Sequence, residues 1–210
     1  YNGYYVTDTG YALYFAPGSI AAAVEGPIYL EFSAQELYPA FVKEAMEPDA
    51  YAQLLPVLTR LANVVAVEFE SFDGVPSSRI ATLYLTYAVN SGAGGDAVAQ
   101  DGDILSLSHA DLLAIYEEAF SGAFPGLDQQ VGSIVLDGDT CQVERVQPPT
   151  AYRLAFSEAQ AGEEGGVTLV GRILFLSQSN MVSDVAGVTI ELTADPAVPA
   201  GYRISAFLIL

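Results

Sequence analysis

Basic residues are scarce in this chain. Its 210 residues include 7 Lys plus Arg against 26 Asp plus Glu, which gives a formal net charge of −19 at pH 7. Proteins that bind nucleic acid need clustered Lys and Arg at the phosphates, so this composition excludes an ordinary nucleic-acid-binding protein. Charged residues make up only 16% of the sequence and hydrophobic residues 51%. A disordered chain has the opposite balance, so we expect a folded, acidic protein with a sizeable core.

Cysteine and histidine occur once each. Cys141 alone can form neither an intrachain disulfide nor a cysteine zinc cluster. It lies in a predicted strand without a neighbouring histidine, so we expect a small buried side chain rather than a nucleophile. His109 alone excludes an HExxH zinc site and leaves a Ser-His-Asp triad with one possible base, and no G-x-S-x-G elbow accompanies it. We expect His109 to be a solvated residue in the first turn of a helix.

Long apolar runs and phosphate-binding loops are lacking as well. The best apolar run, residues 11–24, is broken by Pro17-Gly18 and is shorter than the roughly 20 residues of a membrane-spanning helix. The glycine-rich stretch 92–95 lacks the Lys-Ser/Thr of a phosphate loop. The chain begins at Tyr1 without an initiator Met or a basic and apolar leader, so we expect either a removed signal segment or a longer protein upstream.

The first part of the chain is predicted to be rich in β-structure. Residues 4–15 are aromatic and β-branched on both sides of the turn-forming Asp8-Thr9-Gly10, which predicts a β-hairpin. A strand is expected over 28–32, and short helical segments over 19–24 and from Ser33, where Glu36 completes a capping box. Core packing is the usual role of aromatic strands, and a sugar-stacking or peptide-binding surface is the alternative for the tyrosines of this region, namely Tyr1, Tyr4, Tyr5, Tyr11 and Tyr14.

The middle of the chain is predicted to contain a helix, a hairpin and a loop. Leucines at helical spacing predict an amphipathic helix over 49–61, with Pro56 in its first turn or at a bend. Residues 64–69 and 79–89 are rich in β-branched and aromatic residues and flank a turn-rich segment, so we expect a hairpin. Residues 90–103 are predicted to form an exposed loop.

The last hundred residues are predicted to contain one helix and a succession of strands. Ser108 and Asp111 form a Ser-x-x-Asp helix start, and Gly122 marks the end. The expected buried face of this helix consists of Leu112, Leu113, Ile115, Tyr116 and Phe120. Long strands in succession indicate an antiparallel sheet, and they are expected at 134–136, 141–146, 151–158, 167–176, 185–193 and 202–210.

Carboxylate pairs are the other chemical signal. Asp101 with Asp103, and Asp137 with Asp139, have a spacing that calcium loops use, but neither pair continues into an EF-hand, and Asp beside Gly is typical of turns. Glu144 and Glu158 lie in predicted strands and are candidates for a general acid and base. No residue set identifies a reaction, so no catalytic, cofactor-binding or metal-binding residue is assigned.

The N-terminal segment resembles a known family. Thr7, Gly10, Phe15, Pro17, Ile20, Ala21, Gly26 and Leu37 match the closing motif of the extracellular domain of lysozyme-responsive anti-sigma factors, which is associated with peptidoglycan deacetylases. The resemblance covers about the first 40 positions. It implies that residues 1–48 are the tail of an extracellular domain, with the boundary at 46–49, and that lysozyme or a cell-wall component is a ligand of the family.

The remainder, residues 49–210, resembles exported lipoprotein modules of Gram-positive anaerobes. The helix 107–120 and the closing strand Ala200-Gly-Tyr-Arg-Ile-Ser-Ala carry the resemblance. It implies an α+β fold, cystatin-like or nuclear-transport-factor-two-like, in which a curved antiparallel sheet packs on one or two helices.

Together these features predict a non-enzymatic, extracytoplasmic binding domain of a bacterial surface protein or lipoprotein, anchored through a region upstream of Tyr1. Its expected partner is a basic protein such as lysozyme, or a cell-wall fragment. One alternative is a hydrolase or isomerase that uses carboxylates in the concave face of the sheet. Another is an assembly or scaffold domain.

Overall fold

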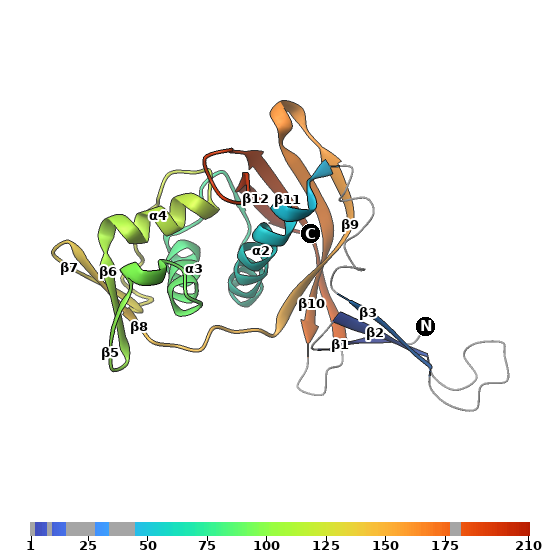
Figure 1. Ribbon diagram of the computed structural model, residues 1–210, viewed down its shortest axis with the longest axis horizontal. Helices are drawn as coiled ribbons and strands as arrows, with labels where there is room; N and C mark the ends of the chain where they lie inside the picture. Colours follow the sequence, from blue (N-terminus) through green and yellow to red (C-terminus); the bar gives the residue numbers. More distant parts are fainter. Residues whose placement is uncertain (1–2, 8–9, 16–27, 34–44, 177–181) are drawn as a thin grey trace.

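The computed structural model describes residues 3–7, 10–15, 28–33, 45–176 and 182–210. Within these ranges the chain is an α+β protein built from antiparallel sheets and three α-helices (Figure 1). The helical segments expected at 19–24 and from Ser33, the turn at Asp8-Thr9 and the motif positions Pro17, Ile20, Ala21, Gly26 and Leu37 lie outside the described residues. The division at 46–49 stays a prediction.

The described N-terminal strands form a three-stranded antiparallel sheet. Strands β1 (Gly3–Thr7) and β2 (Gly10–Phe15) pair as the expected hairpin, and β3 (Ile28–Ser33) pairs with β2. The strands predicted at 4–15 and 28–32 are therefore confirmed.

The longest helix, α2 (Pro48–Glu68), corrects the first of two strand predictions. The expected strand at 64–69 is the last part of this helix. Leu54, Leu58, Leu61 and Val65 are buried at helical spacing, so packing along one helix face overrides the preference of valines for strands. Pro56 lies inside the helix, and the helix ends at Phe69, whose φ is +52°.

Helix α3 (Ser78–Asn90) corrects the second strand prediction, for 79–89. The Ser77 side chain accepts a hydrogen bond from the Ile80 amide at 3.2 Å and begins the helix. The buried residues Ile80, Tyr84 and Ala88 repeat every fourth position, a pattern that only a helix aligns on one face. There is no hairpin between 64 and 89, since the short strand β4 (Phe72–Asp73) pairs with β12 instead.

The predicted helix at Ser108 is confirmed as α4 (His109–Ala119). Ser108 accepts a hydrogen bond from the Asp111 amide at 3.0 Å. The helix ends at Phe120, whose backbone bridges Ile204 in parallel. Gly122 then packs directly on the β4 region, where an added Cβ would lie 2.4 Å from the carbonyl oxygen of Gly74.

Two further sheets lie on either side of the helices. The four-stranded sheet has the order β5-β6-β8-β7, and the five-stranded sheet has the order β4-β12-β11-β10-β9, all antiparallel. The strands predicted from residue 134 onward are confirmed, and β5 together with the 3₁₀ turn at Gly95–Ala97 lies within the expected loop 90–103. The bounds are β5 (Ala99–Asp101), β6 (Ile104–Ser108), β7 (Ile134–Asp137), β8 (Thr140–Glu144), β9 (Tyr152–Ala161), β10 (Val167–Leu176), β11 (Val182–Ala194) and β12 (Tyr202–Ile209).

The five-stranded sheet is the curved sheet that the sequence predicts. Its register shifts between Val170 and Gly171, between Ile173 and Leu174, and between Glu191 and Leu192. Bulges of this kind bend strands and increase their twist. Figure 1 shows α2 against this sheet, with α3 and α4 between α2 and the four-stranded sheet.

Helix α2 also satisfies the length and composition expected of a membrane-spanning helix. Its window Asp49–Glu68 is the one helix in the described ranges that does so, and 44% of it is buried inside the fold. Core helices share these properties, and α2 packs against both α3 and β9. Within this structure it serves as the central helix of the core.

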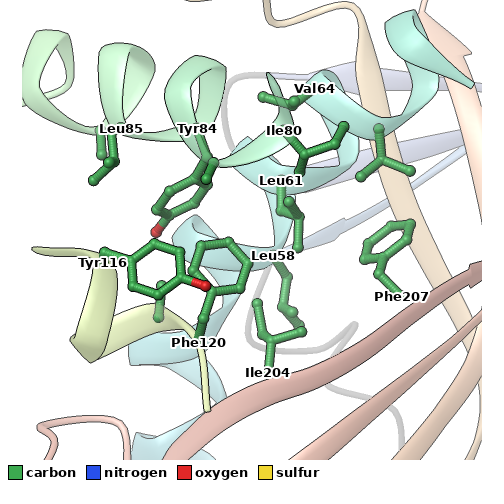
Figure 2. Packing of buried hydrophobic residues seen from close by; sticks show 14 of the residues in the cluster. Leu58, Leu61, Val64, Ile80, Tyr84, Leu85, Tyr116, Phe120, Ile204 and Phe207 are labelled. Atoms are coloured by element: carbon green, nitrogen blue, oxygen red, sulfur yellow. The ribbon is translucent and has the colours of Figure 1, made fainter. Parts of the chain in front are cut away.

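An aromatic cluster joins the helices to the five-stranded sheet (Figure 2). The Phe120 ring stacks on Tyr116 with 4.8 Å between centroids and meets Tyr84 edge-on at 4.9 Å and Phe72 at 5.9 Å. Because these rings come from α4, α3 and β4, one side chain connects three elements. Ile204 and Phe207 of β12 belong to the same buried cluster.

Candidate functional site

The two aspartate pairs are hairpin tips at opposite ends of the four-stranded sheet. Asp101 and Asp103 flank the β5–β6 turn, beside the end of β8, while Asp137 and Asp139 flank the β7–β8 turn, beside the end of β6. The glycine between each pair has a φ of about +60°, as the first central position of a tight hairpin turn requires. Within the described residues, no group of three or more His, Cys, Asp or Glu could hold a metal ion.

His109 is the first residue of α4 and is half-buried. Its backbone amide donates to the carbonyl of Asp139 at 2.8 Å, so this position joins the helix to the β7–β8 turn. Nearby, Ser108 Oγ donates to Asp111 Oδ2 at 2.5 Å, which uses its hydroxyl proton in the helix cap. The arrangement is therefore explained by helix capping.

Cys141 is a buried side chain of β8, as expected. It pairs with Leu107 and Leu136 on the adjacent strands. Burial raises the pKa of its thiol, which disfavours the thiolate that a nucleophile needs.

The two glutamates considered for acid and base roles are not brought together. Glu144 ends β8 in the four-stranded sheet, whereas Glu158 lies on β9 in the five-stranded sheet, and both are exposed. General acid and base catalysis on one substrate needs both groups within hydrogen-bond reach of it.

An open groove lies on the five-stranded sheet, at the end where β9 turns into β10. Its volume is about 310 Å³, and it is lined by polar and apolar residues of β10, β11, β12 and the β9–β10 turn, the apolar ones being Val167, Leu192 and Ala194. The polar lining residues are Glu164, Thr168, Glu191, Thr193 and Ser205. This is the candidate functional site, and it is referred to below as the acidic groove.

Strand alternation places the polar strand side chains of the acidic groove on the face that points away from the helices. Val167, Leu169, Ile190 and Leu192 are buried in the core. Successive side chains on a strand point to opposite faces, so Thr168 and Glu191, which are register partners, point the other way. The strand at Ser205 bulges between Ala206 and Ile204, and Ser205 Oγ donates to the carbonyl of Glu191 at 3.0 Å.

The β9–β10 turn forms one wall of the acidic groove. The Gly162 amide donates to the Gly166 carbonyl at 2.7 Å and closes the turn. Glu164 at its tip has a φ of +54°. The turn packs against the end of β11, since a Cβ atom added to Gly165 would lie 3.5 Å from the Cβ atom of Ala194.

Most of the positive charge in this protein is engaged internally. The sequence holds six arginines, and five of them contact acceptors within the fold: Arg60 with the Tyr84 hydroxyl, Arg79 with Glu68, Arg153 with the Thr150 and Tyr152 carbonyls, Arg172 with Asp184, and Arg203 with Asp195. In the described part of the chain, three carboxylates take part in these ion pairs. The surface therefore presents mainly negative charge.

Sequence reasoning did not assign the residues of the acidic groove. Alternation within 167–176 and 185–193 could have placed Thr168 and Glu191 on one face, but the position of the β9–β10 turn beside β11 and the bulge at Ser205 depend on tertiary structure.

No family model, no curated protein and no solved structure matches this chain.

Proposed function

We propose that this chain is a non-enzymatic binding domain of a bacterial extracytoplasmic protein, anchored to the cell surface, and that its partner is cationic. The expected partner is a basic protein such as lysozyme, and a cell-wall fragment is the alternative. The observation that carries the proposal is the combination of a net charge of −19 with arginines that are mostly engaged within the fold. The resemblance of the N-terminal segment to the lysozyme-responsive family supports the same partner.

Electrostatic attraction has a distinct kinetic signature. A strongly negative surface accelerates the approach of a cationic partner, and this acceleration is lost when salt screens the charges. The Debye length falls from about 10 Å at 0.1 M salt to about 3 Å at 1 M. A specific complex should therefore associate more slowly at high salt and still saturate.

The test is binding of the purified chain to lysozyme and to peptidoglycan fragments at two salt concentrations, measured by surface plasmon resonance. We expect saturable binding whose association rate falls about tenfold or more between low and high salt. Lysozyme with acetylated lysines is the matched control, since acetylation removes the positive charge and keeps the fold of the partner. Absence of binding to both partners at low salt would contradict the proposal.

A further inference from the structure

The acidic groove combines three properties that define a ligand class. Its volume, about 310 Å³, is at the lower end of the roughly 300–1,000 Å³ of ligand pockets, so it fits one side chain or a small molecule. Among the residues that the structure describes, its lining offers the carboxylates of Glu164 and Glu191 and contains no Lys, Arg or aromatic residue. Arg203, the register partner of Thr193 on β12, forms an ion pair with Asp195 at 2.9 Å.

The hydroxyl groups in the acidic groove add acceptors beside the carboxylates. Thr168 and Thr193 lie on the same sheet face as Glu191, and Ser205 already donates its proton to the Glu191 carbonyl. The Ser205 oxygen therefore presents lone pairs. A group with several N–H donors and a positive charge matches such a lining, because charge-assisted hydrogen bonds are the strong ones.

Two other ligand classes fit less well. A sugar ring usually stacks on an aromatic side chain, and the groove lining has none. A calcium ion takes about 6–8 oxygen ligands, commonly from several carboxylates. The described residues of the groove lining supply two carboxylates.

We propose that the acidic groove binds the ammonium or guanidinium group of a lysine or arginine side chain. This proposal rests on the proposed function and locates the contact with the cationic partner. Glu191 on β11 and Glu164 on the turn hold the charge from two sides, while Thr168, Thr193 and Ser205 accept the remaining N–H groups.

A titration followed by NMR tests the groove directly. The probe is N-acetyl-lysine methylamide, and the uncharged isostere N-acetyl-norleucine methylamide is the ligand control. We expect the lysine compound to shift backbone amides of 162–168, 191–194 and 205, and the norleucine compound to leave them in place. Glu191→Gln and Glu164→Gln keep the side-chain shape and should each weaken binding about tenfold. Glu158→Gln, an exposed residue of the same sheet outside the groove lining, should leave it unchanged.

Lysozyme binding then separates the two proposals. If lysozyme binds the wild-type protein and the double variant E164Q/E191Q equally well, and the lysine compound shifts other residues, the groove assignment is wrong while the proposed function stands. If neither lysozyme nor peptidoglycan fragments bind the wild-type protein, the proposed function fails. Shifts in the groove produced by calcium chloride and not by the lysine compound would make it a metal site and overturn this inference.

Discussion

The side-chain amide of Asn63 on α2 forms hydrogen bonds with both backbone groups of Tyr152, the first residue of β9, as a neighbouring strand would. Its Oδ1 accepts the Tyr152 amide at 3.0 Å, and its Nδ2 donates to the Tyr152 carbonyl at 3.0 Å. The same Nδ2 donates to the Thr59 carbonyl one turn earlier at 2.8 Å. Because Asn63 is only 2% exposed, these bonds form in a largely water-free environment and attach the edge of the five-stranded sheet to the core helix.

Asn90 at the end of α3 repeats this arrangement at the four-stranded sheet. Its Nδ2 donates to the Glu144 carbonyl at 3.0 Å, and its Oδ1 accepts the Val146 amide at 3.0 Å. The segment 145–151, which joins the two sheets along the lower edge of Figure 1, is therefore held by a helix asparagine at each end.

Asn63→Ala is expected to be strongly destabilising. It leaves the Tyr152 N–H without its partner, whereas the Tyr152 carbonyl keeps the hydrogen bond from Arg153 Nη1 at 3.0 Å. One unsatisfied buried group costs about 1–3 kcal/mol, so we expect a loss of about 2 kcal/mol in the free energy of unfolding, measured by urea denaturation.

Asn90→Ala is the matched control for Asn63→Ala. Asn90 has the same pattern of bonds but is half-buried, so water can replace its amide, and the expected loss is about 1 kcal/mol. Equal losses for the two variants would contradict the assigned role of burial.

Stability should fall in alkaline solution because of Tyr116. Burial raises the pKa of this phenol to about 12, whereas an unfolded tyrosine titrates near pH 10. Between about pH 10 and 12 the unfolded chain releases a proton that the folded protein keeps, so the stabilisation present below pH 10 is lost as the pH rises. Burial also raises the pKa of Tyr84 and of Cys141, so these two groups likewise lower the stability as the pH rises.

Tyr116→Phe isolates this contribution. At pH 7 the variant loses the bond from the Tyr116 hydroxyl to the Ala123 carbonyl, 3.1 Å long, which should cost about 1 kcal/mol. Above pH 10 the free energy of unfolding of the variant should fall less steeply with pH than that of the wild-type protein. The difference in slope corresponds to about one fewer proton released on unfolding. Urea titrations from pH 8 to alkaline pH measure both effects, and an unchanged slope would show that Tyr116 does not titrate on unfolding.

Cys141 should resist modification in the folded protein. Its thiol is buried in β8 and its pKa is raised, so little thiolate is available to an aromatic disulfide reagent. We expect reaction to be slow in native buffer and complete within the mixing time in denaturant. Rapid reaction at pH 8 without denaturant would contradict the packing of this strand.

The sequence predicted those elements whose signals are local. The Ser108 cap with its apolar face predicts α4, and alternating residues with glycine turns predict the strands β7 to β12, which the structure divides between the four-stranded and the five-stranded sheet. The segments 64–69 and 79–89 were predicted wrongly because valine, threonine and tyrosine favour strands, whereas burial of Val65, Tyr84 and Ala88 against other elements decides for helix. The acidic groove could not be predicted, because Glu164 and Ser205 meet only through the pairing of β10, β11 and β12.

The aromatic cluster offers a last comparison, between two phenylalanines that both touch Tyr116. Phe120 is 1% exposed and contacts three rings, while Phe124 is half-buried and meets Tyr116 edge-on at 5.1 Å. Phe120→Ala should lower the free energy of unfolding by about 3–5 kcal/mol. The substitution leaves a cavity between α3, α4 and β4, and these three packed elements cannot shift to fill it. Phe124→Ala should cost about 1 kcal/mol, since a surface loop can settle into the space. Urea denaturation compares the two, and similar losses would mean that the loop carrying Phe124 is as much a part of the core as the end of α4.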